Sequence, residues 1–182
     1  MISAIAVAPV RPQLYLRRKA PSRQSPGTET IQRYLRNHSL ERIPVNPQEV
    51  NRLIELAHTQ RRGASFNQHE FPGLAYNAAY FSILNSCDAL LAAHGYRARG
   101  HGGHEVALNC ASELVAPLSR NASTLLRTKI GRSARKTRSK VMYDGDGVSA
   151  QALTDIIERS DFLIRILATA SGTHIRKVGC AL

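Results

Sequence analysis

The sequence predicts an all-α protein, an up-and-down bundle of about five helices that follows a basic N-terminal extension. Apolar residues recur at helical spacing in five segments between residues 47 and 171. No segment alternates apolar and polar side chains for long enough to indicate a strand. The 182 residues, 43% of them hydrophobic, suffice for one packed domain, and no apolar run approaches the ~18 residues that cross a bilayer. We therefore expect a soluble, cytoplasmic protein.

Residues 1–36 form the predicted extension, because Pro12, Pro21 and Pro26 prevent a continuous helix there. The segment is poor in acids and contains Arg and Ser, which is typical of an organelle transit peptide. An upstream extension from a misplaced start codon, or a flexible basic arm, fits the composition as well, and we favour these two interpretations. The bundle is predicted over residues 37–174, and a C-terminal tail over residues 175–182.

The first predicted helix of the bundle begins at Pro47 and runs to about Arg61. Asn46 is a good N-cap residue, proline is favoured in the first turn, and Glu49 follows the cap by three residues. After the break at residues 71–73 comes a segment of about 22 residues that ends at Gly95 and is apolar around most of its circumference. Such a helix belongs in the centre of a bundle.

Three further amphipathic segments complete the predicted bundle. They cover residues 104–118, 119–141 and 149–171. Pro117 stops the first of them, and Gly172 stops the last. The middle segment carries an apolar line, which consists of Leu126, Ile130, Ala134 and Val141.

Two polar residues, Asn77 and Asp88, interrupt the apolar central helix. They are eleven positions apart and therefore share a face of the helix. Buried polar side chains need hydrogen-bond partners. We expect the two residues to orient Arg135 or Arg138, to fix the register of the helix, or to do both.

Positive charge is concentrated in two parts of the chain, whose net charge is +12. Residues 1–36 hold seven Lys and Arg against Glu29 alone, and residues 120–140 hold eight and no acid. Such clustering favours a polyanionic partner, of which nucleic acid is the commonest. The alternative is a soluble protein with a basic tail and one basic helix. Tryptophan is absent and aromatic residues make up 5%, which argues against a surface built from stacked bases.

Three arginines of the basic segment, Arg120, Arg127 and Arg138, are spaced by seven and then eleven residues. On an α-helix that continues through Gly131 they lie within ~20° of one another and form a line of about 27 Å. Such a line suits successive phosphates of a nucleic acid. The alternative is a solvated face whose arginine stems cover apolar surface.

Two stretches resemble the HEPN superfamily, the higher-eukaryote and prokaryote nucleotide-binding helical domains. The first is AYNAAYFSILNSCDALLAAHGYRARGHGGHEVAL, and the second is RSARKTRSKVMYDGDG before the last helix. The likeness covers roughly residues 38–172. It implies a helical bundle that commonly dimerises. Many members are metal-independent endoribonucleases, often toxins paired with a small nucleotidyltransferase, and their signature is an Arg followed four to six residues later by a His.

In this sequence Arg138 matches the family arginine, and Tyr143 stands where the His is expected. The resemblance therefore implies a non-catalytic protein of a toxin–antitoxin or defence system that binds RNA or a nucleotide. The expected phosphate contacts are Arg120, Arg127, Arg132, Arg135, Arg138 and His104. One alternative is a metal-independent endoribonuclease toxin in which Arg138 and Tyr143 are catalytic. Another is a protein-interaction module that pairs with a nucleotidyltransferase.

The remaining His, Cys and Tyr residues indicate no cofactor and no metal. His101 and His104 lie among glycines without a nearby Cys or carboxylate pair, which is weak evidence for a metal site. The three cysteines are far apart and lack metal-ligand spacing, so we interpret them as small buried hydrophobes; they are Cys87, Cys110 and Cys180. For Tyr143, packing at the end of the bundle is the favoured role over phosphate binding or modification.

Overall fold

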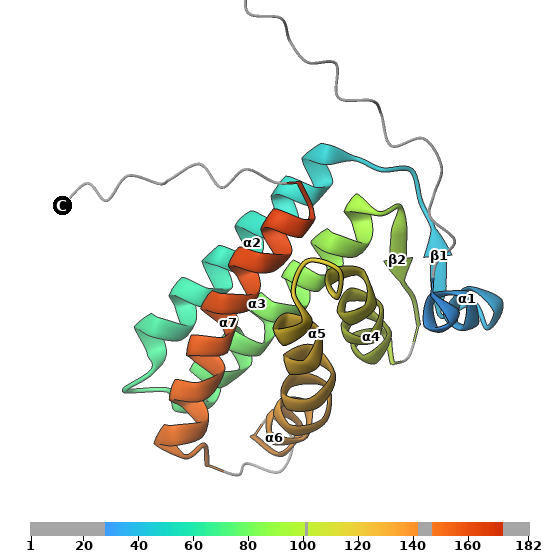
Figure 1. The fold of residues 1–182 in the computed structure, drawn as a ribbon. Helices are drawn as coiled ribbons and strands as arrows, with labels where there is room; N and C mark the ends of the chain where they lie inside the picture. The colour runs from blue at the N-terminus through green and yellow to red at the C-terminus, as the bar shows by residue number, and fades with distance from the viewer. Residues whose placement is uncertain (1–27, 101, 142–146, 173–182) are drawn as a thin grey trace, which may run out of the picture.

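The computed structural model describes residues 28–100, 102–141 and 147–172 of the chain (Figure 1). It confirms the predicted helical bundle. In chain order, the elements are α1 (Glu29–Arg36), β1 (Leu40–Arg42), α2 (Pro47–Asn67), α3 (Pro72–Ala93), β2 (Tyr96–Ala98), α4 (Gly103–Val115), α5 (Arg120–Leu125), η1 (Leu126–Ala134), α6 (Arg135–Ser139) and α7 (Ala150–Ala170). Within the three described ranges, no helix is both long enough and apolar enough to cross a membrane.

The central helix is α3, as its apolar circumference predicts. It contacts α2, α7 and α4, and Figure 1 shows α2, α3 and α7 running side by side. Tyr80, Ile83 and Leu90 on this helix are completely buried. Burial of one such aliphatic side chain stabilises the fold by about 1.5–3 kcal/mol. The polar residues of α3 are therefore held in place by a helix that is packed on several sides.

The start of α2 follows the capping prediction. Asn46 Oδ1 accepts hydrogen bonds from the backbone N–H groups of Gln48 at 3.0 Å and Glu49 at 3.4 Å. Pro47 occupies the first turn, where its missing N–H costs nothing. The helix continues to Asn67, beyond the end predicted near Arg61.

The basic segment forms one continuous helical path made of α5, η1 and α6, but its middle part is not α-helical. Residues Leu126–Ala134 form the π-helix η1. A π-helix closes i→i+5 hydrogen bonds and therefore has more residues per turn than an α-helix. Side chains after η1 are consequently rotated away from the positions that uninterrupted α-helical spacing predicts. The predicted alignment of Arg120, Arg127 and Arg138 on one face assumed that spacing, and η1 interrupts it.

Helix α1 corrects the predicted boundary at residue 36. Residues Glu29–Arg36 form a helix whose Ile31 is 1% exposed and belongs to the main core. The Tyr34 hydroxyl accepts a hydrogen bond from Asn109 Nδ2 of α4 at 2.9 Å. These eight residues of the predicted extension therefore belong to the domain. Residues 1–27, which carry the prolines, lie outside the described ranges.

A small antiparallel pair, β1 and β2, was not predicted. Leu40 is opposite Ala98, and Arg42 is opposite Tyr96. Each strand has three residues, which is too short to show an alternating pattern. The pair ties the chain before α2 to the chain after α3. It thereby directs the glycine-containing loop after β2 toward the start of α4.

Candidate phosphate-binding cleft

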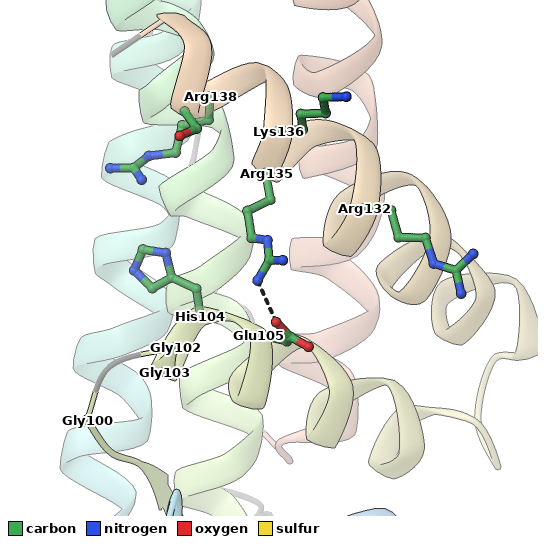
Figure 2. Close-up of a pocket in the computed structure, with 10 residues that line it drawn as sticks. Gly100, Gly102, Gly103, His104, Glu105, Arg132, Arg135, Lys136 and Arg138 are labelled. Carbon is green, nitrogen blue, oxygen red and sulfur yellow. Dashed lines mark hydrogen bonds and ion pairs between the residues drawn. The ribbon is translucent and has the colours of Figure 1, made fainter. Parts of the chain in front are cut away.

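A cleft of about 1020 Å³ opens between the start of α4, the loop before it, and the helix formed by η1 and α6 (Figure 2). Its lining consists of Gly100, Gly102, Gly103, His104, Glu105, Arg132, Arg135, Lys136, Arg138 and Ser139. Four of these side chains are cations and one is a carboxylate. The excess of positive charge on the wall formed by η1 and α6 makes the cleft attractive to anions.

The loop at the floor of the cleft depends on glycine. Gly100 and Gly102 have φ values of 70° and 88°, in the left-handed region that other residues adopt only at a cost. A Cβ added to Gly102 would meet nothing within 4 Å, so the backbone conformation and not the space requires glycine there. Gly102 is also the N-cap of α4 and brings no side chain to its first turn. The positive end of the helix macrodipole therefore faces the cleft without a capping side chain.

Arg138 is held at the cleft by neutral groups of α3. Its Nε donates a hydrogen bond to Asn77 Oδ1 at 3.0 Å. Its Cζ lies 5.1 Å from the centroid of the Phe81 ring and 5.8 Å from that of Tyr80, within the range of cation–π attraction. Among the described residues no carboxylate forms an ion pair with it. Arg138 thus has a fixed position, and within the described residues its charge has no acidic partner.

Arg135 is the cleft arginine that has an acidic partner. Its Nη1 donates a hydrogen bond to Glu105 Oε2 at 2.7 Å, shown by the dashed line in Figure 2. The two side chains are 45% and 54% exposed. An ion pair with this exposure stabilises the fold by at most about 1 kcal/mol. The pair can therefore open at little cost.

His104 comes from the start of α4 and lies against the same two aromatic rings as Arg138. The centroid of its ring is 5.8 Å from that of Phe81 and 6.1 Å from that of Tyr80. Burial lowers the pKa of His104, and the charges of Arg138 and Arg135 lower it further. The imidazole is therefore neutral at pH 7 and can accept a proton. Figure 2 shows the His104 ring and the Arg138 guanidinium on the same side of the cleft, while Arg132 points away from both.

The structure brings together four of the predicted phosphate contacts and separates two from them. Arg132, Arg135, Arg138 and His104 line the cleft. Arg120 and Arg127 are exposed on α5 and η1 and do not line it. The other candidate catalytic residue, Tyr143, lies outside the described residues, as does His101.

The two polar residues of α3 have different surroundings. Asn77 accepts a hydrogen bond from Arg138, which is one of the two arginines that it was predicted to orient. Asp88 lies three turns further along the helix, about 16 Å away at 1.5 Å per residue, and has no recorded contact with Arg135 or Arg138. Burial raises the pKa of Asp88 to about 6. Within the described residues, Asp88 thus has no contact through which it could orient a cleft arginine.

Several residues of the site were not predicted. Glu105 and Lys136 line the cleft, and Tyr80 and Phe81 form the aromatic support of Arg138 and His104. Phe81 follows Asn77 by four positions, a spacing that places both on one face of α3. The Tyr80 hydroxyl is buried and has no hydrogen-bond partner within the described ranges, and burial raises its pKa to about 12. That tyrosine therefore stays protonated.

The buried cysteines fit the sequence interpretation. Cys87 and Cys110 are free thiols inside the bundle, and burial raises the pKa of both. Cys180 lies outside the described residues. Across the part of the chain that the structure describes, no three His, Cys, Asp or Glu side chains are grouped so as to hold a metal ion.

Comparison with known proteins does not assign the chain to a family. The chain matches no protein-family model, no curated protein and no solved structure. The likeness to the HEPN superfamily remains an expectation from the sequence pattern. What the cleft can bind is inferred from its own geometry. It combines cationic side chains, the start of a helix and a histidine whose pKa is lowered.

Proposed function

We propose that the protein is a HEPN-like helical protein that binds RNA or a nucleotide through the cleft between α4 and α6. The observation that carries the proposal is that four cations and the start of α4 line one cavity; the cations are Arg132, Arg135, Lys136 and Arg138. Guanidinium forks and helix N-termini are the groups that proteins use most to bind phosphate. The resemblance in sequence supports RNA or a nucleotide as the bearer of that phosphate.

The architecture supports binding because the cations are presented on rigid elements. Arg138 is fixed by Asn77 of the packed helix α3, so little side-chain freedom is lost when a ligand contacts it. Homodimer formation and pairing with a nucleotidyltransferase rest on the resemblance alone and stay predictions.

The test is the salt dependence of binding to a labelled single-stranded RNA, measured by fluorescence anisotropy. If three or four cleft cations neutralise phosphates, a plot of log Kobs against log salt concentration should fall with a slope of about −2 to −3, since each phosphate of a single strand contributes about −0.7. Arg138→Ala and Lys136→Ala should each weaken binding and reduce the slope by about 0.7. A flat salt response, or no binding, would contradict the proposal and would favour a protein partner for the basic helix.

The control for these variants is Arg52→Ala. Arg52 lies on α2, is paired with Glu49, and does not line the cleft. The substitution removes the same charge from the protein. Binding should therefore be nearly unchanged, and a loss equal to that of Arg138→Ala would show that net charge and not the cleft determines affinity.

A second function, metal-independent cleavage of RNA, is favoured by the placement of His104 beside Arg138. The sequence pattern predicts a histidine after Arg138 on the same helix, where Tyr143 stands. His104 from α4 supports this second function, because it lies against the same aromatic rings as Arg138. A neutral imidazole can accept the proton of a ribose 2′-hydroxyl as its oxygen attacks the adjacent phosphorus. The bond from phosphorus to the 5′-oxygen breaks as the new bond forms, the departing 5′-oxygen takes a proton from water, and a 2′,3′-cyclic phosphate remains. Arg138 can stabilise the charge that develops on the phosphate oxygens.

This second function predicts cleavage of RNA in the presence of EDTA and growth inhibition on expression. His104→Ala and Arg138→Ala should each abolish both effects. His69→Ala is the matched control, because His69 is exposed and contacts Gln68 away from the cleft. Normal growth under strong induction, together with uncut RNA after incubation with the purified protein, would eliminate the enzyme and leave the binding function.

A further inference from the structure

The carboxylate of Glu105 lies among the cations of the cleft and forms an ion pair with one of them. We infer that the cleft prefers a terminal phosphomonoester, carried by a nucleotide or by the end of an RNA strand, over an internal phosphodiester. Glu105 is the residue that imposes this preference. The inference rests on the proposed function, because it specifies which phosphate the cleft binds.

The geometry places Glu105 where a ligand must compete with it. Its Oε2 is 2.7 Å from Arg135 Nη1, and both side chains are about half exposed. Figure 2 shows the pair between the start of α4 and α6, with His104 to one side and Arg132 to the other. A phosphate that contacts Arg135 from the cleft must therefore displace the carboxylate or accept its repulsion.

An internal phosphodiester gains little from this displacement. It carries one negative charge, as the carboxylate does, whereas the carboxylate is attached to the same chain and is present at a high effective concentration. A phosphomonoester carries a charge of about −1.5 to −2 at pH 7 and has three acceptor oxygens. It can contact Arg135 and a second cation at once. Only this class of phosphate outcompetes Glu105.

Arg138 can serve as the second cation. In the part of the chain that the structure describes, it contacts the Asn77 amide oxygen and two aromatic rings, all of them uncharged. Lys136 also lines the cleft and, in the described ranges, forms no ion pair. The volume of about 1020 Å³ exceeds what one phosphate group needs and admits the sugar and base that carry it.

The experiment compares two labelled RNAs of one sequence, one with a 5′-phosphate and one with a 5′-hydroxyl, by anisotropy with the full-length protein. The phosphorylated strand should bind at least about fivefold more tightly, because one further charge 4 Å from a guanidinium is worth about 1 kcal/mol even in water and more near a protein surface. AMP and adenosine serve as competitors. Competition by AMP but not by adenosine identifies a free nucleotide as a sufficient ligand, and competition by neither assigns the phosphate to the end of a strand.

Glu105→Gln tests the role of the carboxylate, since it keeps the size of the side chain and removes its charge. The variant should bind the 5′-hydroxyl strand more tightly than the wild type does, so that the preference falls to about threefold or less. Glu113→Gln, on the same helix and outside the cleft lining, should keep the full preference. A thermal melt of both variants checks that they are folded.

The outcomes separate the inference from the proposed function. Equal affinity of the wild type for the two strands would overturn the inference and leave phosphate binding intact. A preference that Glu105→Gln does not change would overturn the role of Glu105. Failure of the protein to bind either strand would contradict the proposed function as well.

Discussion

Replacement of Asn77 by Ala should weaken RNA binding, although Asn77 does not line the cleft and is not expected to contact the ligand. Asn77 Oδ1 accepts a hydrogen bond from Arg138 Nε at 3.0 Å, and among the described residues this is the one hydrogen bond to that guanidinium. Without it, Arg138 must be immobilised by the ligand, at about 0.5–1.5 kcal/mol for a side chain with many rotamers. Divided by RT, this cost corresponds to a loss of about two- to tenfold in affinity. A loss of about 1 kcal/mol in the free energy of unfolding should accompany it.

The assay is anisotropy with single-stranded RNA, together with urea unfolding followed by circular dichroism. Asn85→Ala is the matched control, because Asn85 lies on the same helix and has no recorded hydrogen bond to the cleft. It should leave affinity unchanged. If Asn77→Ala binds RNA as the wild type does while Arg138→Ala does not, the aromatic rings alone position Arg138 and the reasoning is refuted.

Three further substitutions test the fold around the site. Ile31→Ala should reduce the free energy of unfolding by about 2–5 kcal/mol in urea, because Ile31 is buried in the core, while Arg36→Ala on the exposed side of α1 should change it little. Gly102→Ala should lower the melting temperature through about 1–2 kcal/mol of backbone strain at φ 88°, whereas Gly103→Ala should not. Burial raises the pKa of Asp88 to about 6, so the folded state binds a proton at this carboxyl more tightly than the unfolded state does. The free energy of unfolding should therefore fall by up to about 3 kcal/mol as the pH rises from 4 to 7. Asp88→Asn should abolish this fall in urea titrations across that range; the same pH dependence in the variant would assign it to other groups.

The course of the helices could be predicted because their signals are local. The Asn46-Pro47 cap sets the start of α2, and the apolar circumference of the next segment identifies the buried α3. Both depend on neighbouring residues alone. Helix α1 was missed because Ile31 is its one fully buried residue, which leaves no period to detect.

The π-helix could not be predicted from the sequence. Leu126, Ile130 and Ala134 are buried and spaced by four, and the same spacing is typical of the buried face of an ordinary α-helix. The apolar pattern therefore does not distinguish the two kinds of helix. The predicted alignment of the three arginines assumed α-helical spacing throughout, and η1 interrupts it.

The residues that neighbour the cleft arginines could not be predicted from the sequence, because they come from segments that are distant along the chain. Spacing on α3 identified Asn77 as a candidate partner of an arginine, but not which arginine, since that depends on how α6 packs against α3. His104 precedes Arg138 on the chain, and the start of α4 places it against the same Phe81 ring as Arg138. Spacing along α6 could not indicate this neighbour, because it comes from another helix.

The most direct test of phosphate binding in this cleft is an NMR titration of the 15N-labelled protein with a 5′-phosphorylated RNA. The side-chain Nε–Hε signals of Arg135 and Arg138 and the backbone amide of His104 should shift together, and they should saturate at the dissociation constant measured by anisotropy. Shifts confined to Arg120 and Arg127 on the outer surface, with those three signals unmoved, would contradict the account.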